Sequence, residues 1–231
     1  MTQLAARTEQ TASYPVGRLS SLDMIDADDR SPLSRILARG TIHAPFPRGG
    51  VLFMEGDDAD MVFEIVSGVV RCFALSEDGQ RQIFKFVGPG DMLGLAAMDE
   101  FRYSAEAVDD VVVRAYPRME FELALSRDPD LQAELRRVIC VELLEREQHM
   151  VMLAHMDSIQ RLRWFLHDFT KTARHAADGF IHLPMPRHDI GDFLGLTMET
   201  VSRVFSALKK KGVIDMPRSD RYRLCVGHYH D

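Results

Sequence analysis

The chain has 231 residues, of which 46% are hydrophobic and 27% are charged, a composition typical of a globular protein. No apolar run approaches the roughly 20 residues that cross a bilayer, and the N-terminus lacks the hydrophobic region of a secretory signal. Three scattered cysteines argue against a disulfide framework, so we expect a cytoplasmic protein without a membrane segment.

The net charge of −7 is distributed unevenly along the chain. From residue 158 to the end there are 12 Lys and Arg against 8 Asp and Glu, a net charge of +4, whereas the preceding part has 16 against 27, a net charge of −11. Because local potential governs contact with phosphates, the acidic total does not exclude a nucleic-acid partner for the C-terminal part.

Residues 1–27 are polar and lack a periodic apolar pattern, and we interpret them as a flexible arm. Residues 28–125 form the next predicted domain, with a short helix over 31–39 followed by short strands between glycine-containing turns. Runs rich in β-branched and aromatic residues predict strands at 51–54, 61–66, 69–75, 81–87 and 111–116. Many short strands at close intervals are typical of a rolled or closed antiparallel sheet.

A long helix is predicted over 130–157, within a segment assigned to 126–157, and Asp128-Pro129 provides a natural start. Its apolar residues divide into two predicted faces, which suggests two partners: the sheet domain on one side and a second subunit on the other. The alternative is a single helix buried within one chain. The proposed subunit-contacting face contains Leu135, Ile139, Leu143, Met150 and Ala154, and the second face contains Leu131, Val138, Val141, Leu144 and Val151.

The last predicted domain, residues 158–231, contains an amphipathic helix over 158–176, a short strand over 179–184 and two helices within 189–212. A hairpin follows, from strands at 213–216 and 222–226. Gly195 separates the two helices, and Thr197 is a candidate N-cap for the second helix, which Gly212 ends. The helical spacing of the apolar residues predicts the buried face of this second helix: Val201, Val204, Phe205 and Leu208.

The opposite face of the second helix is polar and bears Glu199, Ser202, Arg203, Ser206 and Lys210. Arginine can donate two hydrogen bonds to guanine, glutamate can accept one from the cytosine amino group, and serine can contact either base. Two helices joined by a glycine-containing turn, the second with such a face, are typical of a DNA-reading helix-turn-helix. An ordinary amphipathic helix with a solvated face fits the same pattern.

The run at residues 194–203, LGLTMETVSR, resembles the signature of the CRP/FNR superfamily of bacterial transcription regulators, and Glu199, Ser202 and Arg203 resemble the motif of its FNR/FixK-type branch. The resemblance covers nearly the whole chain. It implies an α+β fold with an N-terminal antiparallel β-roll like that of cyclic-nucleotide-binding proteins, a long dimerisation helix and a C-terminal winged helix-turn-helix.

The resemblance also implies a function: a homodimer that binds a TTG-N8-CAA-like palindrome in double-stranded DNA and acts with RNA polymerase, as an activator in low-oxygen or related metabolic control. Glu199 and Arg203 would read a conserved G·C pair, and Ser202 a neighbouring base. Met198 stands where the cyclic-AMP-responsive branch has an arginine, so base preference outside the common core should differ. Candidates for contacts with the DNA backbone are Thr197, Thr200, Ser206, Lys209, Lys210, Arg218 and Arg221, although the wing arginines fit solvated charges equally well.

Two sensor sites of the superfamily lack their key residues. An iron–sulfur cluster needs about four cysteines within reach, and the N-terminal arm has none. Leu95 and Tyr103 stand where cyclic-nucleotide-binding members have the glutamate that holds the ribose and the arginine that meets the phosphate. We therefore expect neither an iron–sulfur cluster nor bound cyclic AMP, while haem or a small metabolite in the roll stays an alternative.

No metal site is expected, because the histidines lack ligand-type spacing, and no enzyme is expected, because no nucleophile or phosphate-loop motif is present. The alternative hypothesis from another functional class is an enzyme or an effector-binding module. The signal, the target genes, the choice between activation and repression, and the roles of Cys72, Cys140 and Cys225 are left open by the sequence.

Overall fold

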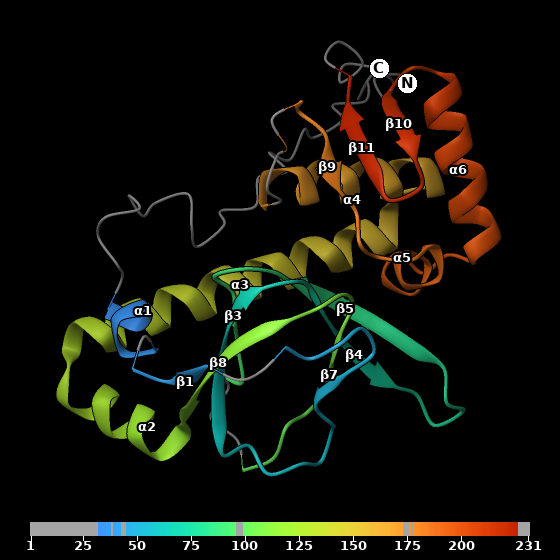
Figure 1. Cartoon of the computed structure of the whole chain (residues 1–231). Helices are drawn as coiled ribbons and strands as arrows, with labels where there is room; N and C mark the ends of the chain where they lie inside the picture. Colours follow the sequence, from blue (N-terminus) through green and yellow to red (C-terminus); the bar gives the residue numbers. More distant parts are fainter. Residues whose placement is uncertain are drawn as a thin grey trace, which may run out of the picture.

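The computed structural model describes residues 32–37, 39–42, 45–95, 99–172, 176 and 178–225 (Figure 1). The predicted arm at 1–27 lies outside the described residues. A roll of β-strands packs along one side of a long helix, and a smaller unit of helices and strands packs near the C-terminal end of that helix (Figure 1). Among the described residues, no helix combines the length and apolar character needed to cross a bilayer.

Two four-stranded antiparallel sheets form the roll, with strand orders β1-β8-β3-β6 and β2-β7-β4-β5. Their inner faces enclose a core in which Phe53, Ile65 and Val113 are buried. The strands are β1 (Thr41–Ile42), β2 (Val51–Phe53), β3 (Met61–Ser67), β4 (Val70–Leu75), β5 (Arg81–Val87), β6 (Met92–Leu93), β7 (Ser104–Ala107) and β8 (Val112–Pro117). The five predicted strands are confirmed within one or two residues, whereas the short strands β1, β6 and β7 were not predicted.

Three helices flank the roll in the sequence. Helix α1 (Pro32–Leu37) precedes the strands, and α2 (Arg118–Arg127) and α3 (Pro129–His155) follow them. The long helix is confirmed, while α2 was not predicted. Asp128 separates the two, because its carboxylate accepts hydrogen bonds from the backbone N–H groups of Asp130 and Leu131 and so caps the start of α3.

The apolar residues of α3 are distributed differently from the two predicted faces. Leu131 is buried and Leu135 and Val138 pack against the cluster around Phe121, so Leu135 belongs to the intrachain core rather than to the exposed face. Leu144 and Val151, predicted on the second face, are exposed. The reason is that α3 packs on α1 and α2 near its start and on other helices near its end, so one lengthwise division into faces does not apply. The exposed apolar residues, here called the α3 stripe, are Ile139, Leu143, Leu144, Met150 and Val151, each between 45% and 63% exposed.

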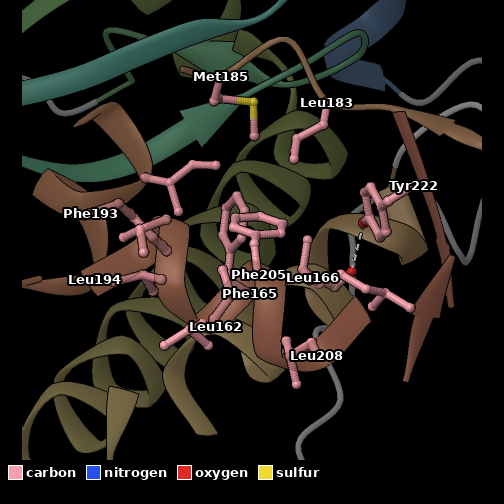
Figure 2. Close-up of a cluster of buried hydrophobic side chains, with 14 of the residues drawn as sticks. Leu162, Phe165, Leu166, Leu183, Met185, Phe193, Leu194, Phe205, Leu208 and Tyr222 are labelled. Carbon is pink, nitrogen blue, oxygen red and sulfur yellow. Dashed lines mark hydrogen bonds between the residues drawn. The ribbon is translucent and has the colours of Figure 1, made fainter. Parts of the chain in front are cut away.

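The C-terminal unit contains the predicted helix-turn-helix and wing. Its elements are α4 (Ser158–Thr172), β9 (Ile181–His182), α5 (Arg187–Leu194), α6 (Met198–Lys210), β10 (Ile214–Arg218) and β11 (Arg221–Leu224), and its strands form one sheet in the order β10-β11-β9. Figure 2 shows the core, where Phe165 and Leu166 of α4 meet Phe205 and Leu208 of α6. Tyr222 of β11 is also buried there and donates a hydrogen bond to the Leu166 carbonyl at 2.8 Å.

The turn between α5 and α6 requires a glycine at two positions. Gly195 has φ of 62° and ψ of 41°, the left-handed conformation that ends a helix at little cost only in glycine. Gly191, one turn earlier, accepts a hydrogen bond from the Leu196 N–H at 3.0 Å. A Cβ at residue 191 would lie 2.5 Å from the Leu196 carbonyl oxygen, so the backbone approach depends on its absence.

The last carbonyl groups of a helix have no partner within it, and the two final ones of α5, at Phe193 and Leu194, are satisfied by neighbouring helices. His149 of α3 contacts the Phe193 carbonyl oxygen through Nε2 at 2.9 Å, and its ring stacks on the Phe193 ring at 4.2 Å. Arg161 of α4 donates to the Leu194 carbonyl at 2.8 Å and to the Leu153 carbonyl of α3 at 2.8 Å. The end of α5 is therefore fixed to both helices.

Replacement of Gly191 by alanine should lower the free energy of unfolding by about 1–3 kcal/mol, because the added methyl group overpacks a contact with rigid backbone. Gly88→Ala is the matched control, since a Cβ there meets nothing within 4 Å, and it should change the free energy by less than about 0.5 kcal/mol. Chemical denaturation measures both values. Equal effects of the two substitutions would contradict the assigned role of Gly191.

Acidification should destabilise the fold through His149. Burial lowers the pKa of this histidine, and the hydrogen bond to the Phe193 carbonyl offsets only part of the shift. The folded state thus binds a proton less readily than the unfolded chain, so the contribution of His149 is complete above about pH 6.5 and is lost as the pH falls below that value. His149→Gln should flatten the decline of unfolding free energy between pH 7.5 and 5.5, whereas replacement of the exposed His155 by Gln should leave the decline as in the wild type.

Candidate nucleic-acid interface

The three residues predicted to read bases lie together on the exposed side of α6. Glu199, Ser202 and Arg203 are all exposed, in the first two turns of the helix, while the apolar residues of the opposite side are buried. Thr197 is the N-cap, as predicted, because its hydroxyl oxygen accepts a hydrogen bond from the Thr200 N–H at 3.2 Å. In Figure 1, α6 lies at the outer edge of the C-terminal unit, away from the roll, so this side is open to a large partner.

Glu199 and Arg203 present an acceptor and a donor one helical turn apart. Hydrogen bonds from its own backbone N–H and to Thr197 lower the pKa of Glu199, and the charge of Arg203 lowers it further, so Glu199 is ionised at neutral pH. Arg203 donates to the Thr200 hydroxyl at 3.1 Å, which orients the guanidinium along the helix. The pair can therefore accept from one base and donate to another within one groove.

The predicted backbone-contacting residues differ in how free their polar groups are. Thr197, Ser206 and Lys210 are all exposed. The Ser206 hydroxyl already donates a hydrogen bond to the Ser202 carbonyl at 3.0 Å. Lys209 donates to the Met216 carbonyl of β10 at 2.8 Å, so it ties the wing to α6. The sequence showed three consecutive lysines but not this division of roles.

The two predicted wing arginines are paired with acidic residues. Arg221 forms an ion pair with Asp178, in the loop before β9, and Arg218 lies 3.2 Å from the Asp220 carboxylate. Arg218 is the more accessible, because it is exposed at the tip of the hairpin whereas Arg221 is half-buried. Exposed ion pairs are weak, so phosphates can compete for Arg218.

Arg187, at the start of α5, was missed by the sequence analysis. Its guanidinium lies 3.5 Å from the centroid of the Phe205 ring of α6 and donates to the Ser219 carbonyl of the wing at 3.0 Å. Burial lowers its pKa to about 10, which still leaves it protonated at neutral pH. Arg187 thus joins α5, α6 and the wing into one unit, and no sequence pattern distinguishes it from a solvated arginine.

Leu95 and Tyr103 both pack among other side chains, Leu95 in the cluster around Phe121 of α2 and Tyr103 against the core of the roll. Leu95 is buried, and the Tyr103 ring packs edge-on against Phe84 and Phe53, at 5.3 Å and 5.4 Å between centroids. Burial raises the pKa of Tyr103, and it raises that of the neighbouring Cys72 to about 12, so both groups are neutral.

Charged groups between the roll and α3 are paired with each other. Lys85 of β5 lies 3.7 Å from both Glu142 and Glu145 of α3, and Arg146 donates to Glu142 at 3.0 Å. Within the described ranges, no three His, Cys, Asp or Glu side chains are grouped closely enough to hold a metal ion.

Two family models match the chain. One coincides with the roll, and the other lies within the C-terminal unit. Residues 44–128 match the cyclic nucleotide-binding domain, and residues 183–214 match the bacterial regulatory proteins of the crp family.

Relatives match most of the chain. The nitrogen fixation regulation protein FixK of Azorhizobium caulinodans is 35% identical over 205 residues, covering 87% of this chain and 82% of that protein. The transcriptional activator protein FnrA of Stutzerimonas stutzeri is 34% identical over 201 residues, covering 84% and 79%. The solved structure of FixK2 from Bradyrhizobium japonicum superposes with a TM-score of 0.76 at 34% identity, covering 80% of this chain and 92% of that chain. The chain belongs to the CRP/FNR family of bacterial transcription regulators, in its FNR/FixK-type branch.

Proposed function

We propose that this protein binds double-stranded DNA as a homodimer, at a palindrome close to TTG-N8-CAA, and activates transcription with RNA polymerase under low-oxygen or related metabolic control. The observation that carries the proposal is the exposed group of Glu199, Ser202 and Arg203 at the start of α6. The protein works by binding and recruitment in the cytoplasm and makes or breaks no bond. The name of the FnrA relative, a transcriptional activator protein, supports the activator role.

Each subunit inserts α6 into a major groove. Arg203 donates to guanine, Glu199 accepts from the paired cytosine and Ser202 contacts a neighbouring base, while Lys210 and Arg218 approach phosphates on either side. The N-terminal end of α6, which carries Glu199, Ser202 and Arg203, faces the DNA in the usual orientation of a recognition helix. Two such helices in a dimer address half-sites about one DNA turn, or roughly 34 Å, apart.

The α3 stripe is the proposed subunit interface. Five large apolar side chains exposed along one helix form a patch that water solvates poorly, and a second copy of α3 would cover it. A two-fold axis along such a contact is also what a palindromic target requires, because each half-site then meets an identical reading helix.

We further propose that DNA binding needs no cyclic nucleotide and no iron–sulfur cluster. A ribose has no carboxylate partner at buried Leu95, and the aromatic packing of Tyr103 takes the place of a phosphate-binding cation. Lys85 of β5 supports the proposal that no cyclic nucleotide is needed. Its positive charge already lies beside the carboxylates of Glu142 and Glu145 of α3. Haem binding is the alternative, and an absorption spectrum of the purified protein tests for it directly.

Arg203→Ala should weaken binding to a TTG-N8-CAA duplex by about 1–3 kcal/mol and leave binding to a random duplex nearly unchanged, because the lost hydrogen bonds are to a base. Fluorescence anisotropy with labelled duplexes measures both affinities, and cyclic AMP in the buffer should alter neither. An equal loss on both duplexes would count against base reading by Arg203.

Lys210→Gln is the matched control for this measurement. It removes an exposed charge from the same helix, so it should weaken binding to both duplexes alike and reduce the slope of log affinity against log salt by about 1. A wild-type protein that prefers neither duplex would refute the proposed target site.

Leu143→Glu should convert the dimer to a monomer, because it places a charge in the middle of the α3 stripe. Light scattering after size exclusion should give the 26.2 kDa of one chain for the variant and twice that mass for the wild type. Met119→Glu is the control, since Met119 is 83% exposed on α2 and lies outside the stripe. A dimeric Leu143→Glu protein, or a monomeric wild type, would exclude this interface.

A further inference from the structure

Helix α5 rests directly on the roll, and the two parts of the chain share one apolar core. The Phe193 ring of α5 lies 5.4 Å from the Phe86 ring of β5. Phe73 of β4 and Ile83 of β5 are buried in the same cluster as the core residues of the reading unit. The C-terminal unit is therefore packed on the β4–β5 hairpin, as Figure 1 shows, and not only joined to the roll through α3.

A buried carboxylate lies at the edge of this contact. Asp189 of α5 is fully buried, and its two oxygens accept from two arginines of the roll: Arg71 at 2.7 Å and Arg81 at 2.5 Å. Arg71 in turn pairs with Glu106, its neighbour across the β4–β7 ladder, at 2.6 Å. His188 also lies 3.1 Å from Asp189, on the outer side.

A second carboxylate extends the contact along α5. Arg81 donates to the Asp192 carboxylate through Nε at 2.9 Å and through a terminal nitrogen at 2.8 Å. The next residue of β5, Gln82, donates to the Asp192 backbone carbonyl at 2.5 Å. Arg71, Arg81, Asp189 and Asp192 are called the α5 ion cluster below.

Such a cluster specifies a geometry more than it adds stability. Desolvation cancels much of the attraction between buried charges, but an ion left without its partner in that environment is costly. A small slide or rotation of α5 on the roll would separate Asp189 from one of its two arginines. Arg81 adds direction, because its Nε and Nη2 groups both donate to the same oxygen of Asp192, Oδ2, while Nη2 also donates to Asp189.

The reading helix follows the orientation of α5. Only three residues separate α5 from α6, and the close approach of Gly191 to Leu196 makes their turn rigid. With the α5 ion cluster formed, Glu199, Ser202 and Arg203 stay exposed, so the docked arrangement leaves the reading side open.

We propose that Arg71, Arg81, Asp189 and Asp192 are positioning residues for DNA reading: they fix the direction of α6 relative to the roll and α3, and thereby the half-site spacing that a dimer accepts. This inference rests on the proposed function. It assigns a role in site selection to two arginines of the roll that lie outside the proposed reading helix.

The test compares affinities for duplexes that differ only in spacing. One additional base pair between the half-sites, TTG-N9-CAA, moves one half-site by about 3.4 Å and rotates it by about 35°. The wild type should strongly prefer the N8 duplex. In Arg81→Gln, and separately in Asp192→Asn, the ratio of the N8 to the N9 affinity should fall at least about fivefold. A loss of fold alone would lower both affinities and leave their ratio unchanged.

Arg114→Gln is the matched control. Arg114 is an arginine of the roll that forms an ion pair with Glu64, and its side chain is 21% exposed against 23% for Arg81. This variant should keep the wild-type spacing ratio. An unchanged ratio in both Arg81→Gln and Asp192→Asn, or an equal change in Arg114→Gln, would overturn the proposal.

A measurement without DNA separates this proposal from the proposed function. Amide hydrogen exchange in α5 and β5 should be faster in Arg81→Gln and Asp192→Asn than in the wild type and unchanged there in Arg114→Gln. If the wild type proves to have no preference for the palindrome, the proposed target fails on its own. Unaltered exchange in both cluster variants would refute the docking role of the α5 ion cluster whatever the DNA result.

Discussion

The position of the reading helix depends on how the carbonyl groups at the end of α5 are satisfied. Helix α5 has only eight residues, so most of its hydrogen-bonding groups lie near an end. His149 and Arg161 supply donors from two other helices, and Gly191 accepts from the turn itself. Because each donor comes from a separate element, α5 cannot move without losing several hydrogen bonds together.

The positive charge of the C-terminal part is used partly inside the protein. Arg187 and Arg161 hold helices and wing together, and Lys209 connects α6 to β10. The charge available to phosphates is therefore smaller than the basic residues of that part suggest. Some carboxylates of the acidic first part are likewise paired within that part, since Glu142 of α3 forms an ion pair with Lys85 of the roll.

The sequence predicted best what is encoded locally. The period of Val201, Val204, Phe205 and Leu208, together with the Thr197 cap, defined α6 almost to the residue. It failed where distant partners decide the outcome. Strand β7 (Ser104–Ala107) has little intrinsic β preference and forms because β2 and β4 flank it. No local pattern marks Asp189 as a buried residue, since its arginine partners lie 108 and 118 positions earlier in the chain.

The core shared by the roll and the reading unit affects how such proteins can exchange parts. A boundary drawn at residue 157 divides the chain cleanly along the sequence, but it cuts through a packed interface that includes Phe86 and Phe193. A chimera that joins this winged unit to a foreign roll would expose those rings and leave Asp189 without its arginines. We therefore expect that a functional chimera of two relatives must take the β4–β5 hairpin and α5 from the same parent.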